Sequence, residues 1–243
     1  MRRAALGPGS GLRPDLSSAC ALALAGACAL APTHVHANDV VPKTTVIVGT
    51  LATWTVAGLT GHPLDCLAEG PAPHGGTDGW GGRVEGFKDK ELKYASFGVV
   101  RRDCHVSRVA GFDLDVAPVV SVGYWHASSV AQPGPAYPDI ATPGHTSAWD
   151  LSLVPMFHWK LPVGGGVLLD TEVGIGPAVL STPEIGLRRK STNFQFSDHL
   201  GIGLASADGH WRAMLAYRHV SNADIAKPNN AVDFAGVALE WKP

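Results

Sequence analysis

The sequence predicts an all-β protein, an eight-stranded antiparallel transmembrane β-barrel that follows an N-terminal signal peptide. Three observations lead to this fold class. From residue 80 onward, short runs of alternating hydrophobicity are separated by turns. Several runs have roughly 12–15 residues, which is longer than an ordinary strand and sufficient for a tilted strand to cross a bilayer. Large aromatic residues lie near the ends of the runs, where the interfacial girdles of membrane barrels are found.

About eight runs follow one another to the C-terminus. We expect strands over Trp80–Phe87, Glu91–Arg102, Phe112–His126, Thr146–Lys160, Gly166–Val179, Ser191–Ser206, His210–Asn222 and Ala231–Trp241. The fourth and fifth runs are expected to be joined by a turn at 161–163. Short turns alternate with long loops, as in a barrel with tight turns at one end and extended loops at the other.

The faces of the runs favour a membrane barrel over a soluble one. In the fourth run, Trp149, Leu151 and Leu153 alternate with Asp150 and Ser152, so one face is large and apolar and the other is polar. A soluble, lipocalin-like barrel would bury the large residues and expose the charged ones. A membrane barrel inverts this arrangement, with lipid outside and a polar interior. The soluble barrel remains the alternative.

Composition excludes some classes of function. The formal net charge is −2, charged residues make up 16% of the chain, and no block of Lys and Arg is present. These values argue against a nucleic-acid partner. The 29 Gly and 18 Pro favour many turns over long helices.

The chain divides into three parts. Residues 1–37 are expected to be a signal peptide, because arginines precede an apolar run and small residues follow at the cleavage position. Residues 38–79 are expected to be an extension or linker, although the apolar run Val46–Leu59 is an alternative signal. Residues 80–243 are expected to form the barrel. Cys66 and Cys104 lie outside the leader, and in an oxidising periplasm a disulfide is the simplest use of them.

A candidate catalytic group lies near the C-terminus. His219 and Ser221 are two residues apart, so in a strand they share a face, and Asp233 reaches the neighbouring strand after a Pro-Asn-Asn turn. A hydroxyl, a base and a carboxylate that orients the base are the parts of an activated serine nucleophile. A second His-x-Ser pair, His126 and Ser128, lacks a carboxylate at matching spacing and is interpreted as the entry to a loop.

The same alternation predicts that the candidate group faces lipid. Leu215 and Tyr217 share a face with His219 and Ser221, and Val237 shares one with Asp233. Polar groups at such a position are costly unless they hydrogen-bond to one another. Acyl esters already in the membrane are the substrate class that such a site would meet.

One carboxylate interrupts the apolar face of the sixth run. Asp198 lies between Phe196 and Leu200 on that face, where lipid exposure would make a charge costly. A position near the rim and a contact with the candidate catalytic group both explain it, and we favour the rim.

From residue 80 to the end, the chain resembles the PagL-type lipid A 3-O-deacylases of Gram-negative outer membranes. The segment HVSNADIAKPNNAVD carries the resemblance, and FQFSDHLGIGLAS and TEVGIGPAVLS support it. The resemblance implies an outer-membrane barrel whose active site opens on the outer leaflet. It also implies hydrolysis of the ester at position 3 of lipid A in lipopolysaccharide, with no cofactor and no metal.

Roles follow from the resemblance residue by residue. Ser221 would be the nucleophile, His219 the general base and Asn222 a contributor to the oxyanion hole. Asp233 stands where the family pattern has Glu, so its shorter reach to His219 is left open. The acyl chain would rest on Leu215, Tyr217 and Val237, and the phosphates of lipid A would meet Arg188, Arg189 and Lys190.

Two further points stay open from the sequence. A non-catalytic eight-stranded outer-membrane barrel with a structural or adhesive role is the alternative function. The oligomeric state is also undetermined, with a homodimer as one option.

Overall fold

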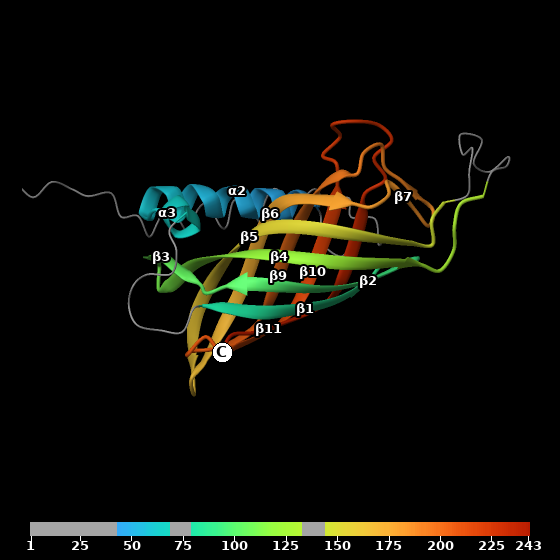
Figure 1. Cartoon of the computed structure of the whole chain (residues 1–243). Helices are drawn as coiled ribbons and strands as arrows, with labels where there is room; N and C mark the ends of the chain where they lie inside the picture. Colours follow the sequence, from blue (N-terminus) through green and yellow to red (C-terminus); the bar gives the residue numbers. More distant parts are fainter. Residues whose placement is uncertain (1–42, 69–78, 133–143) are drawn as a thin grey trace, which may run out of the picture.

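A computed structural model describes residues 43–68, 79–132 and 144–243. The expected signal peptide at residues 1–37 and parts of the expected linker lie outside the described residues. Within the described part, the chain forms a closed antiparallel barrel with two helices on its outside (Figure 1).

Eight strands of the described chain form the barrel wall, which confirms the predicted fold class. Each pairs with its neighbours in antiparallel fashion, and the pairing of β2 with β4 closes the sheet. The wall strands are β1 (Trp80–Lys88), β2 (Leu92–Arg101), β4 (Phe112–Ala127), β5 (Ser147–Gly164), β6 (Val167–Leu180), β9 (Phe194–Ser206), β10 (Trp211–Ser221) and β11 (Val232–Trp241).

Three local features differ from the expected runs. β3 (Cys104–Val109) adds a hairpin to the start of β4. The long connection between β6 and β9 contains a short hairpin, β7 (Glu184–Ile185) and β8 (Arg188–Arg189). The turn expected at 161–163 is wrong: β5 continues to Gly164, and the chain reverses at Gly164–Gly166, where all three residues have positive φ. Glycine adopts that conformation without steric cost, whereas Pro162 can end a ladder without reversing the chain.

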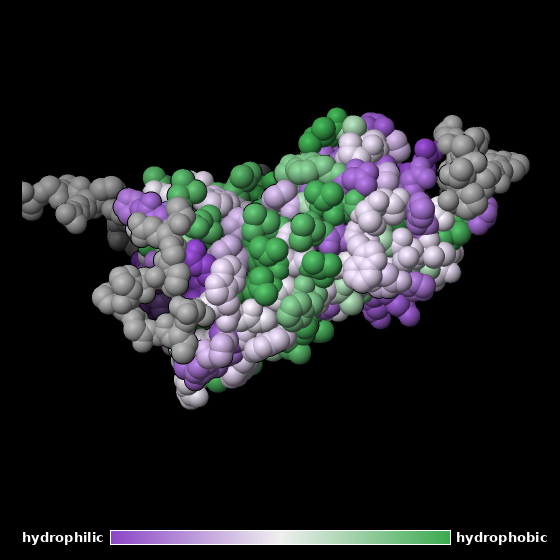
Figure 2. Space-filling model, in the orientation of Figure 1, coloured by the Kyte–Doolittle hydropathy of each residue, from purple (hydrophilic) through white to green (hydrophobic). Residues whose placement is uncertain are grey.

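The barrel wall is apolar outside and charged inside, as the alternation predicts. On β5, Trp149 and Leu151 are exposed, whereas Asp150 between them is 3% exposed. Hydrophobic residues gather over the middle of the face in Figure 2, between more hydrophilic ends. Inside, the Arg83 guanidinium lies 2.7 Å from a Glu172 carboxylate oxygen. Charges buried in a narrow interior persist where they are paired and hydrogen-bonded in this way.

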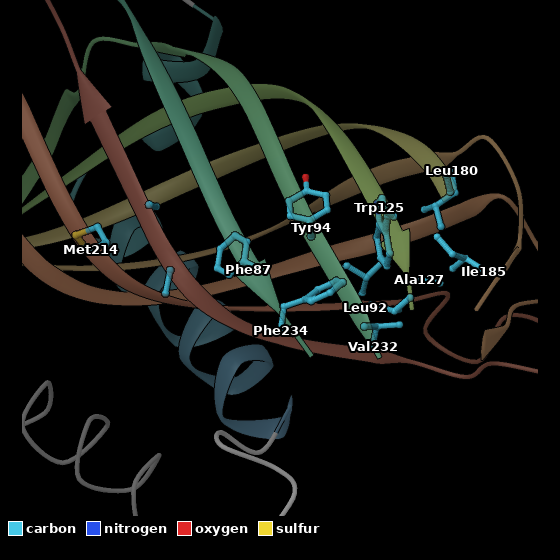
Figure 3. Packing of buried hydrophobic residues seen from close by; sticks show 14 residues of the cluster. Phe87, Leu92, Tyr94, Trp125, Ala127, Leu180, Ile185, Met214, Val232 and Phe234 are labelled. Atoms are coloured by element: carbon cyan, nitrogen blue, oxygen red, sulfur yellow. The ribbon is translucent and has the colours of Figure 1, made fainter. Parts of the chain in front are cut away.

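One end of the interior is filled by apolar side chains instead. We call it the site end: β4 and β10 end there, and β5, β9 and β11 begin there. The Trp125 and Phe234 rings meet edge to face there, with centroids 5.0 Å apart (Figure 3). Val220 on β10 and Val232 on β11 belong to the same buried cluster. These inward-pointing residues alternate with the candidate catalytic residues, so packing inside the barrel anchors the strand ends that carry the site.

Two helices occupy the segment expected to be an extension or linker. α2 spans Lys43–Thr60 and α3 spans Pro63–Ala68, and both lie along the outside of the barrel (Figure 1). The apolar run Val46–Leu59, the alternative signal, makes up most of α2. Neither helix in the described part of the chain combines the length and apolarity that a membrane crossing requires.

The helices are held by packing and by a covalent bond. The Trp54 ring meets the Phe157 ring edge to face, with centroids 4.7 Å apart. Leu114, which points outward from β4, is fully buried in the same cluster. Cys66 of α3 and Cys104 of β3 form a disulfide. The helices therefore cover part of an outer face that would otherwise be exposed.

Candidate active site

The strand register brings His219 and Asp233 together. The two residues are direct cross-strand partners on β10 and β11, and His219 Nδ1 lies 2.7 Å from Asp233 Oδ1. The Tyr217 hydroxyl donates to the same carboxylate oxygen. A carboxylate with these two partners holds the imidazole in one orientation and leaves its Nε2 for another group.

Ser221 lies two residues beyond His219 on β10. The residue between them, Val220, points into the buried cluster, so both flanking side chains point to the outer side of the wall. No hydrogen bond joins the His219 and Ser221 side chains among the described residues. The Ser221 hydroxyl instead accepts a long hydrogen bond of 3.4 Å from the Ala223 backbone N–H. Catalytic hydrogen bonds are often long in the absence of substrate.

The site is more enclosed than the sequence predicts. His219 is 2% exposed and Ser221 is 8% exposed, although both follow the outward alternation of β10. Asp198 on β9 is the other cross-strand partner of His219 and is also buried. Of the two positions that the sequence allows for Asp198, the register selects the one beside the imidazole. Its Oδ1 atom has no hydrogen-bond partner in the described structure.

The contacts of Asn222 favour a positioning role. Its side-chain amide donates to Ser191 Oγ at 2.9 Å and to the Ala226 carbonyl at 2.8 Å, which occupies both amide protons. Its Oδ1 accepts from the Asp224 backbone N–H, and its own N–H donates to Asn229 Oδ1. Asn222 therefore organises the loop after β10, and its side-chain donors are not free for an oxyanion.

Lys190 ties that loop to the strand ends. The buried Lys190 Nζ donates to the carbonyls of Val220 at 2.9 Å and Asn230 at 3.0 Å. Burial, helped by the charge of Arg188 and opposed by Asp233, lowers the pKa of Lys190 from 10.5 to about 7. One side chain thus fixes the chain just before Ser221 and just before β11. Two of the three Nζ donors are thus used within the protein, and the contact with phosphate stays an untested prediction.

The two arginines predicted to meet phosphate have protein partners as well. Arg188 lies 2.9 Å from an Asp89 carboxylate oxygen, and Arg189 lies 3.2 Å from Glu184. These ion pairs tie the basic loop to the turn after β1 and to β7. Because each charge is already balanced, the contact with phosphate stays an untested prediction for both residues.

The predicted acyl-binding residues fall into two groups. Leu215 and Val237 are cross-strand partners on the outer face, 68% and 50% exposed. Tyr217 is two residues closer to the site end than Leu215 on the same face of β10. Its side chain is buried, and its hydroxyl donates a hydrogen bond to Asp233. Apolar surface therefore leads along the wall toward the His219–Asp233 pair.

The second His-x-Ser pair shows none of this organisation. His126 is exposed at the end of β4, and the exposed Ser128 hydroxyl donates to the Glu91 carbonyl. In the described part of the chain, no group of three or more His, Cys, Asp or Glu side chains is arranged to hold a metal ion.

Comparison with known proteins connects this geometry to a family. The family model described as lipid A 3-O-deacylase (PagL) matches residues 108–242, more than half of the chain and all of β9, β10 and β11. The chain belongs to this family. α2 and α3 lie outside the matched range.

Relatives within the PagL family are moderately similar. The lipid A deacylase PagL of Bordetella bronchiseptica is 33% identical over 129 residues, which cover 53% of this chain and 63% of that protein. The lipid A deacylase PagL of Pseudomonas aeruginosa is 31% identical over 83 residues, 34% of this chain and 47% of that protein. The matched part therefore spans less than two thirds of each relative.

A solved structure matches the barrel. The crystal structure of the outer membrane enzyme PagL superposes with a TM-score of 0.51 and 19% sequence identity. The match covers 67% of this chain and 98% of that one. At this identity, the likeness shows the shared fold.

Three residues around the site have contacts or positions that differ from those favoured from the sequence. Tyr217, predicted to contact the acyl chain, positions Asp233. Lys190, predicted to meet phosphate, binds two carbonyls. Asp198 is recognisable in the sequence as a carboxylate that interrupts an apolar face, and that interruption is the available signal for its place beside His219.

Proposed function

We propose that this chain is a serine-type ester hydrolase that removes the acyl chain at position 3 of lipid A. The observation that carries the proposal is the 2.7 Å contact of His219 with Asp233 across neighbouring strands, with Ser221 two residues further along β10. This arrangement occurs in a member of a family described as lipid A 3-O-deacylases. The contact also supports the role of Asp233, which meets the imidazole despite being one methylene shorter than Glu.

The reaction follows from these positions. Asp233 holds His219 Nδ1, so Nε2 accepts the Ser221 hydroxyl proton as Oγ bonds to the acyl carbonyl carbon. The tetrahedral intermediate then breaks its bond to the sugar oxygen, which takes the proton from the imidazolium. Water, deprotonated by His219 in the same way, cleaves the acyl-enzyme, releases the fatty acid and restores the serine.

The oxyanion requires a donor near Ser221, and the Ala223 backbone N–H supplies one. It already points at the Ser221 hydroxyl, from a loop in which Ala223 and Asp224 have positive φ of 52° and 61°. Such strained backbone persists where surrounding contacts hold it, and here Asn222 makes those contacts. An oxyanion donor of this kind contributes about 3 kcal/mol to the transition state.

The outer surface supports a location in the outer membrane of a Gram-negative bacterium. The exposed residues of the wall form an apolar band (Figure 2). Leu215 and Val237 are exposed on the outer face of the two strands that carry the site. A membrane-embedded acyl ester would approach along this surface by lateral diffusion, with its chain against these two residues. The homodimer stays a prediction, which chemical cross-linking in membranes would test.

The test is hydrolysis of lipopolysaccharide by the purified protein in detergent, followed by mass spectrometry of the lipid A. We expect loss of one 3-hydroxyacyl group with the wild type and with Ser129→Ala, an exposed serine on the loop after β4. Ser221→Ala and His219→Asn should leave the lipid A intact. Unchanged lipid A with the folded wild type would favour the non-catalytic barrel, and activity that survives Ser221→Ala would refute the serine mechanism.

A further inference from the structure

One rung of the barrel wall joins the site to a pair of lysines. At the site end, successive cross-strand partners run His126, Lys93, Lys88, Ala235 and Tyr217 across β4, β2, β1, β11 and β10. Neighbouring strands lie about 4.8 Å apart, so Lys88 is roughly 10 Å from the strand that carries the nucleophile. Ser221 itself lies four residues beyond Tyr217 along β10, about a further 13 Å, so Lys88 and the nucleophile are roughly 16 Å apart.

The two lysines are an unbalanced pair. Lys88 and Lys93 are direct cross-strand partners and both are exposed. Like charges directly opposite each other destabilise a sheet. In the described part of the chain, no acidic side chain forms an ion pair with either lysine. The adjacent Asp89 is bound by Arg188.

A pocket connects the lysine pair to the candidate catalytic group. It has a volume of about 630 Å³, and Lys88, Lys93, Tyr217 and Asp233 contribute to its wall. Glu91 also lines it, so the wall carries acidic as well as basic groups. The Asp233 carboxylate is already engaged by His219 and Tyr217. Lys90 lines the pocket as well, so the lysine pair supplies two of the three ammonium groups in its wall.

On the side of the lysines away from the site end, the outer wall carries two small residues. The next outward-facing rung places Gly86 and Ala95 side by side, between the larger Tyr124 and Val237. A Cβ built on Gly86 would meet no atom within 4 Å, so the space outside it is open. Small residues between large ones form a groove that a hydrocarbon chain can follow down the wall.

We propose that the outer wall binds an anionic phosphate group of the lipid substrate at Lys88 and Lys93, with an acyl chain lying over Gly86 and Ala95. We call this region, formed by these four residues, the notch. An ammonium pair at the boundary between an apolar band and the polar rim matches a phosphorylated glycolipid, whose charge and chains meet at that depth. The inference rests on the proposed function, because it describes how the substrate of that reaction is oriented toward Ser221.

The experiment compares two substrates and two kinds of change. Lipid A is used with its phosphates and after enzymatic dephosphorylation, in the same detergent. Lys88→Gln combined with Lys93→Gln removes the charge, Lys88→Arg combined with Lys93→Arg keeps it, and Gly86→Leu fills the groove. Matched controls are Arg108→Gln, an exposed cation at the opposite end of the barrel, and Gly58→Leu on the exposed side of α2.

The expected result is selective. The double Gln variant should lower kcat/KM for phosphorylated lipid A at least tenfold, mainly by raising KM, and leave the dephosphorylated substrate unchanged. The double Arg variant should restore the activity, and Gly86→Leu should raise KM for both substrates. Equal losses on the two substrates, or no loss on either, would overturn the phosphate site.

A binding measurement separates this inference from the proposed function. Ser221→Ala protein is titrated with intact lipid A in detergent, with and without the double Gln change. Binding that depends on the lysines supports the notch even where the wild type hydrolyses nothing, and lysine-independent binding overturns it. Competition by inorganic phosphate would assign the site to the phosphate alone, whereas lysine-dependent binding without competition would assign it to the whole lipid headgroup.

Discussion

The outer wall of the barrel has two halves that follow the same alternation and yet meet different surroundings. On one half, outward-facing Leu114 and Val116 are fully buried beneath the helices. On the other, outward-facing Leu215 and Val237 are left bare. The alternation states which side of the wall a residue faces, whereas what covers it depends on distant parts of the chain. The candidate catalytic residues adjoin the bare half, where an acyl chain has access.

The largest effect on activity is expected from Asp233→Asn on the bare half. The amide cannot hold His219 with Nδ1 protonated or stabilise the imidazolium, so kcat should fall by about 10³–10⁴-fold. Asp233→Glu supplies the acid that the resemblance to the family implies and should keep activity within about tenfold of the wild type. Initial rates on lipopolysaccharide measure both. A small effect of Asp233→Asn would mean that Asp198, the carboxylate on the other side of the imidazole, does the orienting instead.

A smaller effect is expected from Lys190→Met, which removes the donors to the Val220 and Asn230 carbonyls. Because these contacts position the strand ends, kcat should fall by roughly tenfold, within the range of effects expected from a displaced reacting group. Lys227→Met, which changes an exposed lysine of the β10–β11 loop, serves as the control. An unchanged kcat in a folded Lys190→Met protein would show that the loop needs no such tie.

Lys190 also predicts a dependence of stability on pH. Its folded pKa of about 7 lies below the ordinary value of 10.5, so the unfolded chain binds more protons between these values. Stability should therefore rise with pH across that window, and the penalty of burying the charge should be complete below pH 7. Thermal unfolding between about pH 6 and 9 should show Tm increasing, with a flatter profile for Lys190→Met. Identical profiles for the two proteins would contradict the burial argument.

The smallest effect on activity is expected on the covered half. Replacing Cys66 and Cys104 by Ser removes a link across 38 residues, which stabilises by about 4 kcal/mol in the chain-entropy model. Limited proteolysis should then cut α2 and α3 faster while lipid A hydrolysis stays near the wild-type rate. A large loss of activity would show that the covered half also supports the site.

The barrel is largely predictable from the sequence because its alternation is local. Each wall strand depends on residues two apart, so the amino-acid order alone reveals the inverted pattern of Asp150 between Trp149 and Leu151. The position of α2 is not predictable in this way. The run Val46–Leu59 is apolar on several sides, and its docking against Phe157 is a contact between distant parts of the chain.

The candidate site likewise has residues that local spacing predicts and residues whose roles depend on distant contacts. The motif and the alternation indicate His219, Ser221 and Asp233, because their spacing along two adjacent strands sets their positions. The roles of Lys190 and Asn222 depend on contacts between loops that no local pattern encodes. Both residue types suggest chemistry, phosphate binding and oxyanion binding, whereas the folded chain uses their donors to hold carbonyls and a hydroxyl.

The central claim, that Ser221 is the nucleophile, is tested most directly with an alkyl fluorophosphonate that reacts with activated serines. The purified protein is labelled in detergent and digested, and its peptides are analysed by mass spectrometry. We predict one phosphonate adduct, on Ser221, which disappears in His219→Asn. An adduct on another serine, or an unmodified Ser221 in protein that deacylates lipopolysaccharide, would contradict the account.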